Sequence, residues 1–256
     1  MTRFFERRSH GITSAAFILG AASLIARLLG VLRDRILAGK FGAGDALDIY
    51  YASFRIPDSI YDLVILGALS VAFLPMLTEA FQKNQGWRFA SIILNLAGVS
   101  LLGVAGLMVI FASPLMAFIA KGFSPEQTAM AVIMTRILAL SPILLGLSSI
   151  FGTILQVHKR FIVYALSPIF YNCGIIFGAL VLTPFMGIYG LGIGVAMGAF
   201  FHFLFPFLSV LKLGFHWQAR LDFQDKMLRQ TIALGMPRIL SSAGSQINLL
   251  VMTVMA

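Results

Sequence analysis

The apolar positions of this chain fall into long runs rather than short alternating segments. Seven runs reach or exceed the roughly 20 residues that an α-helix needs to cross a bilayer. They cover residues 12–38, 48–78, 89–113, 127–155, 161–183, 188–211 and 232–256. This pattern predicts an all-α membrane protein, a multi-pass helical bundle of about seven transmembrane helices that forms a single transmembrane domain, residues 1–256.

Polar residues interrupt the first two runs. The first contains Arg27, Arg33 and Asp34. A charge at the bilayer centre costs about 2.5 to 3.5 kcal/mol even on the insertion scale, so we expect these charges to face a bundle interior or a water-filled cavity. At about 100° per residue, Arg27 and Asp34 fall on nearly the same helix face, while Arg33 points elsewhere. Pro57 removes a backbone donor and is expected to kink or unwind the second run.

Composition and charge agree with a membrane protein. The chain is 59% hydrophobic and 11% charged, whereas a soluble domain is about 45–50% apolar and about 25% charged. The formal net charge of +9 would indicate nucleic-acid binding in a soluble protein. Here the positive-inside bias accounts for much of it, and no nucleic-acid partner is expected.

The basic residues of the loops predict the orientation. On the side opposite the N-terminus, the connections contain Lys40 and Lys121. The N-terminal tail and the alternate loops contain 11 basic residues, which are Arg3, Arg7, Arg8, Lys83, Arg88, Lys159, Arg160, Lys212, Arg220, Lys226 and Arg229. Because cytoplasmic loops carry the excess of Lys and Arg, the N-terminus is predicted to be cytoplasmic.

Smaller signals refine this picture. Ser124-Pro125-Glu126-Gln127 predicts a capping box at the start of the fourth helix. Asp222 and the apolar residues after it predict a short interfacial helix near 222–230. Glycines in the sixth run predict close helix packing. Since the chain stops inside an apolar run after seven helices, it is interpreted as half of a two-lobe transporter.

Two interpretations are open for Arg27, Arg33 and Asp34. They form a structural ion pair with arginines that reach toward lipid headgroups, or they line an anion-binding cavity. The planar fork of arginine suits phosphate and pyrophosphate groups.

Further polar residues lie in other helices. Arg55, Asp58 and Asp62 form one polar stripe if the second helix is continuous, and this stripe either neutralises itself or takes part in gating or cation binding. The remaining candidates for a polar path or gate are Pro57, Pro168, Asn172, Arg136, Arg238, Gln246 and Asn248. Buried amides usually join helices, and Arg238 is expected to mark the cytoplasmic entry of its helix.

An enzyme, a metal site and a cofactor find little support in the sequence. It contains no Ser-His-Asp, HExxH or P-loop arrangement. One cysteine, Cys173, and four scattered histidines give no metal-ligand spacing. We therefore expect a non-enzymatic protein without metal or cofactor.

Several segments, in order along the chain, resemble one family. ARLLGVLRDRILAGKFGAGDALD (26–48) resembles the first helix and loop of the MurJ/MviN family, the bacterial lipid II flippases of the MOP exporter superfamily. FRIPDSIYDLVILGALSVAFLPML (54–77) resembles its second helix. GTILQVHKRF (152–161), SPIFYN (167–172) and LGMP…SQIN (234–248) resemble later family motifs.

The resemblance implies the N-terminal lobe of a fourteen-helix, two-lobe protein in the bacterial cytoplasmic membrane. It implies that Arg27 and Arg33 are cavity arginines and that Asp34 and Asp48 match acidic positions of the family. The second helix departs from the pattern. Tyr61 stands where a third functional arginine is expected, Asp62 where a basic residue is usual, Leu66 where a glutamate is usual, and Asp58 replaces an asparagine.

The expected function is flipping of lipid II or a related polyprenyl-diphosphate-linked sugar lipid by alternating access, for peptidoglycan synthesis. The expected partners are this lipid, membrane lipids and a second transmembrane lobe. Two alternatives stay open. One is a non-transporting or degenerate membrane interaction module, which the altered second helix favours. The other is a drug or oligosaccharide-lipid exporter of the same superfamily.

Overall fold

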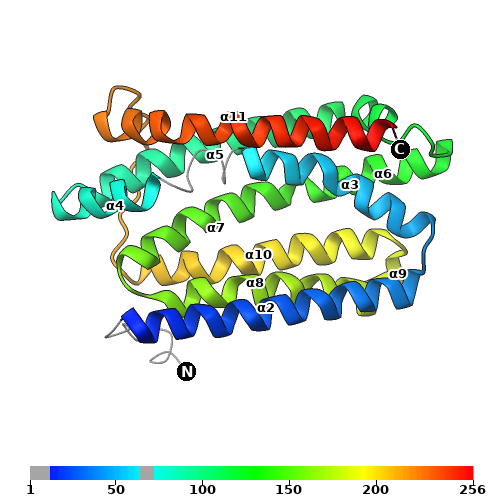
Figure 1. Cartoon of the computed structure of the whole chain (residues 1–256), viewed down its shortest axis with the longest axis horizontal. Coiled ribbons are helices and arrows are strands. Elements are labelled where there is room, and N and C mark those ends of the chain that lie inside the picture. The colour runs from blue at the N-terminus through cyan, green and yellow to red at the C-terminus, as the bar shows by residue number, and fades with distance from the viewer. Residues whose placement is uncertain (1–11, 64–71, 256) are drawn as a thin grey trace.

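Helices make up most of the molecule and run along one common direction (Figure 1). The structure is a computed structural model that describes residues 12–63 and 72–255. Within these ranges it contains no β-strand. The elements are α2 (Ile12–Phe41), α3 (Asp45–Tyr61), α4 (Phe73–Gln82), α5 (Gly86–Ile119), α6 (Pro125–Leu138), α7 (Leu140–Val157), α8 (Phe161–Phe177), the π-helix η2 (Gly178–Leu182), α9 (Thr183–Met186), α10 (Tyr189–Leu211) and α11 (Lys226–Met255).

Five helical segments among the described residues are long and apolar enough to cross a membrane. They are Ala16–Phe41, Gly86–Ile119, Pro125–Val157, Phe161–Met186 and Tyr189–Leu211. They coincide with five of the seven predicted runs and confirm a multi-pass helical protein. The other two runs are helical where they are described. The second run is divided between α3 and α4, and residues 64–71, which include Leu66, lie outside the described part. The seventh run lies in α11, which is not among the five segments that are apolar enough to cross a membrane.

The loops predicted to be cytoplasmic gather at one end of the bundle. The α4–α5, α7–α8 and α10–α11 connections lie at the left end of Figure 1, close to the start of α2. The α2–α3 and α5–α6 connections, which contain or adjoin Lys40 and Lys121, lie at the opposite end. This separation follows the predicted distribution of basic residues, although Arg3, Arg7 and Arg8 lie outside the described residues.

Prolines act differently in two of the predicted runs. The fourth run is two helices, since α6 ends at Leu138 and α7 begins at Leu140. Pro142 has no N–H to offer the carbonyl of Leu138, and its ring crowds that carbonyl, which accounts for the break. Pro57, by contrast, lies buried inside α3, which continues to Tyr61 and bends between its ends in Figure 1.

The predicted capping box is confirmed. Ser124 Oγ accepts a hydrogen bond from the Gln127 N–H (3.2 Å), and Gln127 Oε1 accepts one from the Ser124 N–H (2.7 Å). Two orphan donors at the start of α6 are thereby satisfied.

Small residues bring α8 and α10 into backbone contact, as the sixth run predicts. A Cβ on Gly194 would lie 2.4 Å from Gly178 Cα and 2.7 Å from the Gly174 carbonyl oxygen. Any larger side chain would therefore force the two helices apart. Toward the end of the bundle with the predicted cytoplasmic loops, a larger apolar core forms around the fully buried residues Phe73, Leu77, Ile92, Ile154 and Leu155.

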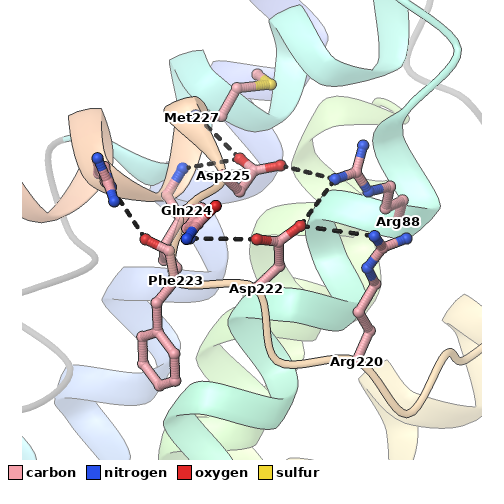
Figure 2. A network of polar contacts seen from close by, with 9 residues as sticks. Arg88, Arg220, Asp222, Phe223, Gln224, Asp225 and Met227 are labelled. Carbon is pink, nitrogen blue, oxygen red and sulfur yellow. Dashed lines mark hydrogen bonds and ion pairs between the residues drawn. The ribbon is translucent and has the colours of Figure 1, made fainter.

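The interfacial helix expected near residues 222–230 does not form a separate element. Residues 221–225 have no regular helix, and α11 begins at Lys226 and continues to Met255. Asp225 Oδ1 accepts hydrogen bonds from the N–H groups of Met227 (2.9 Å) and Leu228 (3.1 Å). This side chain caps α11 and sets its first turn in line with the rest of the helix. Figure 2 shows Asp225 in this network.

Candidate functional site

A cavity of about 230 Å³ lies where α2, α3 and α8 meet. Pockets for drug-sized ligands measure about 300–1,000 Å³, so this space is smaller than such a pocket. The lining residues are Arg33, Asp34 and Leu37 from α2, Tyr50, Tyr51, Phe54 and Asp58 from α3, and Tyr171 and Ile175 from α8.

Arg33 is held in a fixed orientation at the edge of this cavity. Its Nε donates to Asp34 Oδ1 at 2.9 Å, and its Nη2 lies 2.8 Å from the same oxygen. Its Nη1 donates to Asn172 Oδ1 at 3.1 Å. A guanidinium carries five N–H donors, so these two hydrogen bonds and the ion pair leave at least two donors for a ligand. The Arg33 side chain is 27% exposed and therefore accessible from the cavity.

Asn172 connects α8 to α2. It is buried, and its Nδ2 donates to the Pro168 carbonyl (3.0 Å) and to the Ala26 carbonyl (3.4 Å). Because its oxygen accepts from Arg33, every polar atom of this amide is bonded. Asn172 thus joins helices and also positions a cavity arginine, and the Pro168 carbonyl helps to hold it.

Aromatic rings form the opposite part of the lining. Tyr50 is buried, and its ring packs edge-on against Phe54, with centroids 4.7 Å apart, and against Tyr51 at 5.4 Å. Tyr171 approaches from α8. Among the described residues that line the cavity, Arg33 is the cation, and Asp34 and Asp58 are carboxylates. The arrangement combines an arginine fork with flat apolar surfaces and hydrogen-bond acceptors.

The structure corrects the expected geometry of the first helix. Arg33 and Asp34 both line the cavity, whereas Arg27 is exposed and does not line it. Arg27 and Asp34 share a helix face, but seven residues separate them by about 10 Å along the axis. A prediction from the helical angle alone therefore leaves Arg33 out of the cavity. In the structure its long side chain reaches the cavity from the position next to Asp34.

Two other candidates on α3 lie outside the cavity lining. Asp48 is exposed in the first turn of α3, and Arg55 is partly buried further along the same helix. Asp58 alone of the predicted α3 stripe lines the cavity.

Asp62 and Gln246 form a bridge between α3 and α11. Gln246 Nε2 donates to Asp62 Oδ2 (2.7 Å), and Ser59 Oγ donates to Gln246 Oε1 (3.0 Å). Tyr61 makes a separate link, from its Oη to Ser149 Oγ on α7 (3.1 Å). These departures from the family pattern thus take part in contacts between helices.

The remaining arginine candidates are placed away from the cavity lining. Arg136 donates from Nε to the Val109 carbonyl of α5 (3.2 Å). Arg238 is exposed on α11. It does not mark the entry of its helix, because α11 begins at Lys226, about 18 Å earlier along the axis. Asn248 is exposed two residues beyond Gln246.

Sequence reasoning missed the aromatic lining. Tyr50, Tyr51 and Phe54 occur within five residues of α3, and Phe54 follows Tyr50 by four residues and Tyr51 by three, the two spacings that place side chains next to each other on a helix. Tyr171 directly precedes Asn172. The clustering of aromatics beside charged residues in a membrane helix was the available signal.

Comparison with known proteins agrees with this architecture. A family model described as "Lipid II flippase MurJ" matches residues 37–256. The chain is 32% identical over 208 residues to a probable lipid II flippase MurJ of Borreliella burgdorferi, covering 80% of this chain and 41% of that protein. It is 28% identical over 256 residues to a probable lipid II flippase MurJ of Vibrio cholerae, covering 94% of this chain and 49% of that protein.

A solved structure shows the same fold. It is described as lipid II flippase MurJ in an inward closed conformation, and it aligns with a TM-score of 0.74 at 26% identity. The match covers 93% of this chain and 50% of that structure. The chain therefore spans about half the length of the relatives that it matches.

Proposed function

The chain belongs to the lipid II flippase MurJ family, and from this premise we propose that it forms the N-terminal lobe of a flippase of the bacterial cytoplasmic membrane. The lobe binds the pyrophosphate-sugar head of a polyprenyl-linked cell-wall precursor, lipid II or a related lipid. A second transmembrane lobe completes the transport path, and the two lobes alternate between inward-open and outward-open states for peptidoglycan synthesis. The lipid tail stays in the bilayer.

The observation that carries this proposal is the position of Arg33. Its guanidinium is oriented by Asp34 and Asn172 and keeps two N–H donors for a ligand. Charge-assisted hydrogen bonds to phosphate are stronger than neutral ones. A donor that is already oriented loses less entropy when the ligand binds.

The aromatic residues extend the proposal to the sugar. Tyr50, Tyr51 and Phe54 offer ring faces and edges against which the apolar face of a sugar ring packs, and Asp58 accepts hydrogen bonds from hydroxyl groups. Arg27 is assigned a different part, since it is exposed about 9 Å from Arg33 along α2. In this proposal it contacts the headgroup at the entrance to the cavity.

Binding of purified lipid II, measured by native mass spectrometry, tests this function. Arg33→Ala is expected to weaken binding at least tenfold, because a hydrogen bond to a charged group contributes about 1.5–3 kcal/mol. Arg27→Ala is expected to weaken binding less than Arg33→Ala. Arg35→Ala is the matched control, since Arg35 is exposed on the same helix and does not line the cavity. Binding that is indifferent to Arg33 would rule out the cavity as the headgroup site.

A non-transporting interaction module is the second candidate. The observation that favours it is the use of Tyr61 and Asp62 in contacts between helices, where the family pattern has basic residues. Transport in vesicles, measured with the second lobe of a relative supplied on a separate chain, separates the two. Lipid II binding without any flipping would support the module.

A further inference from the structure

Residues 212–225 connect α10 to α11 without a helix or strand, yet they are tied to α5. Asn95 Nδ2 donates to the carbonyls of Gln218 (2.7 Å) and Arg220 (2.9 Å). Asn95 Oδ1 accepts a hydrogen bond from Trp217 Nε1 (2.8 Å). The partly buried amide of Asn95 thus holds three residues of the connection, Trp217, Gln218 and Arg220, and fixes the course of the backbone between them.

Large apolar side chains of this connection face outward. Trp217 is 63% exposed, Leu221 50% and Phe223 60%. Phe215, in contrast, packs against the apolar core. Because the indole N–H of Trp217 is already bonded to Asn95, its exposed part is an apolar ring. Figure 2 shows the ring of Phe223 directed away from the polar network beside it.

The acidic and the basic side chains of the same region point in different directions. Asp222 and Asp225 both turn toward Arg88, with Arg88 Nη2 at 3.1 Å and 3.3 Å from their carboxylates (Figure 2). Their side chains are 23% and 12% exposed. Lys226 and Arg229 are exposed. The two carboxylates are therefore paired with Arg88 and with Arg220, whose Nη2 lies 3.7 Å from Asp222. The exposed Lys226 and Arg229 lie close to the exposed aromatic rings, and Arg229 Nε donates to the Phe223 carbonyl (3.0 Å).

We propose that residues 212–229, here named the strap, bind the headgroups of anionic phospholipids at the membrane interface. Tryptophan and phenylalanine beside outward-facing Lys and Arg are the combination that anchors a segment at headgroup level. The outward charge is positive, and the cytoplasmic leaflet carries the anionic lipids that attract such segments. The strap lies at the end of the bundle where the predicted cytoplasmic loops gather (Figure 1).

A second group of aromatic side chains, at the same end of the bundle, supports the placement of the strap at the level of the lipid headgroups. Trp87 stacks on His158 with centroids 5.5 Å apart, and Phe81 packs edge-on against both rings. Aromatic side chains gather where a protein crosses from hydrocarbon to headgroups. This proposal is independent of the substrate that the cavity binds.

Fluorescence quenching by brominated lipids tests the strap. The chain has two tryptophans, so Trp87→Phe leaves Trp217 as the reporter. The protein is placed in phosphatidylcholine vesicles with a minor fraction of phosphatidylglycerol, and bromine is carried by one lipid or the other. Quenching per brominated lipid is expected to be about fivefold stronger for phosphatidylglycerol, which corresponds to the attraction of one basic residue to an anionic surface.

Charge variants decide whether the strap causes the preference. Lys226→Gln with Arg229→Gln is expected to bring the quenching ratio close to one. Lys226→Arg with Arg229→Lys keeps the charge and is expected to keep the ratio, as is Lys121→Gln at the other end of the bundle. Should Trp87→Phe fail to fold, the signal lost on Trp217→Phe in the native background gives the same readout.

Three outcomes would overturn the proposal. Absence of quenching by either lipid would mean that Trp217 faces water or is covered by the second lobe. Equal quenching by both lipids would mean contact with the membrane without recognition of anionic headgroups. An unchanged ratio in the Gln variants would place the recognition elsewhere.

Discussion

Two helix contacts in this lobe are built on opposite principles. Along α8 and α10, glycines bring the backbones together, and α10 buries residues from Gly190 to Val210. Along α2, the described residues 16–41 contain two buried side chains, Ala22 and Leu37. Yet α2 supplies Arg33 and Asp34 to the cavity.

The closely packed helices and the helix that supplies the charged cavity residues are thus different parts of the molecule. The α8–α10 pair is closely packed and forms a wall from which Tyr171 lines the cavity and Asn172 bonds to Arg33. The α2 helix is attached to this wall by polar bonds, such as those of Asn172, and by the packing of one fully buried side chain, Leu37, in an apolar cluster with Ile175 and Ala179. Since polar bonds in membranes are individually weak, we expect α2 to separate from its neighbours at a lower free-energy cost than α8 separates from α10.

The largest expected effect comes from breaking the glycine contact. Gly194→Val places a side chain where a Cβ already meets Gly178 Cα at 2.4 Å. Backbone atoms cannot rotate away, so we expect the free energy of unfolding to fall by about 3 kcal/mol. Thermal unfolding in detergent and size-exclusion profiles measure it.

Gly106→Val is the control for this substitution. A Cβ on Gly106 meets nothing within 4 Å, so the same change is expected to alter stability by less than about 0.5 kcal/mol. Equal destabilisation by both variants would show that valine destabilises these helices at any position, so that the α8–α10 contact does not set the cost.

The second effect is the coupling between Arg33 and Asn172. Each single change to Ala removes their 3.1 Å bond, and the double variant is expected to lose less than the sum of the two by about 1 kcal/mol. Lipid II affinity and thermal stability are measured for all four proteins. Additive losses would mean that Asn172 joins helices without positioning Arg33.

These regions also differ in how far the sequence predicts them. The helices, the end that gathers basic loops and the Ser124 capping box follow from local rules, because bilayer thickness, loop charge and cap chemistry act within short stretches. Glycine spacing in the sixth run likewise indicates the close contact with α8, although it does not name the partner helix.

The cavity depends on contacts between distant segments. Periodicity relates Arg27 to Asp34 by angle, but it contains no information on which height along α2 faces Tyr50 and Tyr171. Similarly, the sequence makes Asp62 and Gln246 separate polar candidates, but their bond joins the C-cap of α3 to α11 across 184 residues. The family resemblance indicates Arg33 as a candidate cavity residue. Its bonding partner, Asn172, becomes evident only from the packing of α8 against α2.

A smaller effect is expected where α11 meets α3. Gln246→Leu removes the bonds to Asp62 and Ser59, each worth about 0.6 kcal/mol in a membrane. The predicted loss is about 1 kcal/mol of stability, with faster hydrogen exchange in α11. Asn248→Leu, at an exposed position two residues away, serves as the control. Indistinguishable exchange in the two variants would contradict a specific bridge.

The smallest effect concerns Tyr61, where the family pattern has an arginine. Tyr61→Phe removes only the hydroxyl that bonds Ser149 at 3.1 Å, and the expected loss is about 0.6 kcal/mol of stability. Ser149→Ala removes the same bond from α7 and also the bond from Ser149 Oγ to the Leu145 carbonyl (3.0 Å), so the double variant should lose no more stability than Ser149→Ala alone. If Tyr61→Phe instead leaves stability unchanged but weakens lipid II binding, the hydroxyl contacts the headgroup. The replaced arginine position would then belong to the substrate path, and α3 would contribute to binding through a neutral donor.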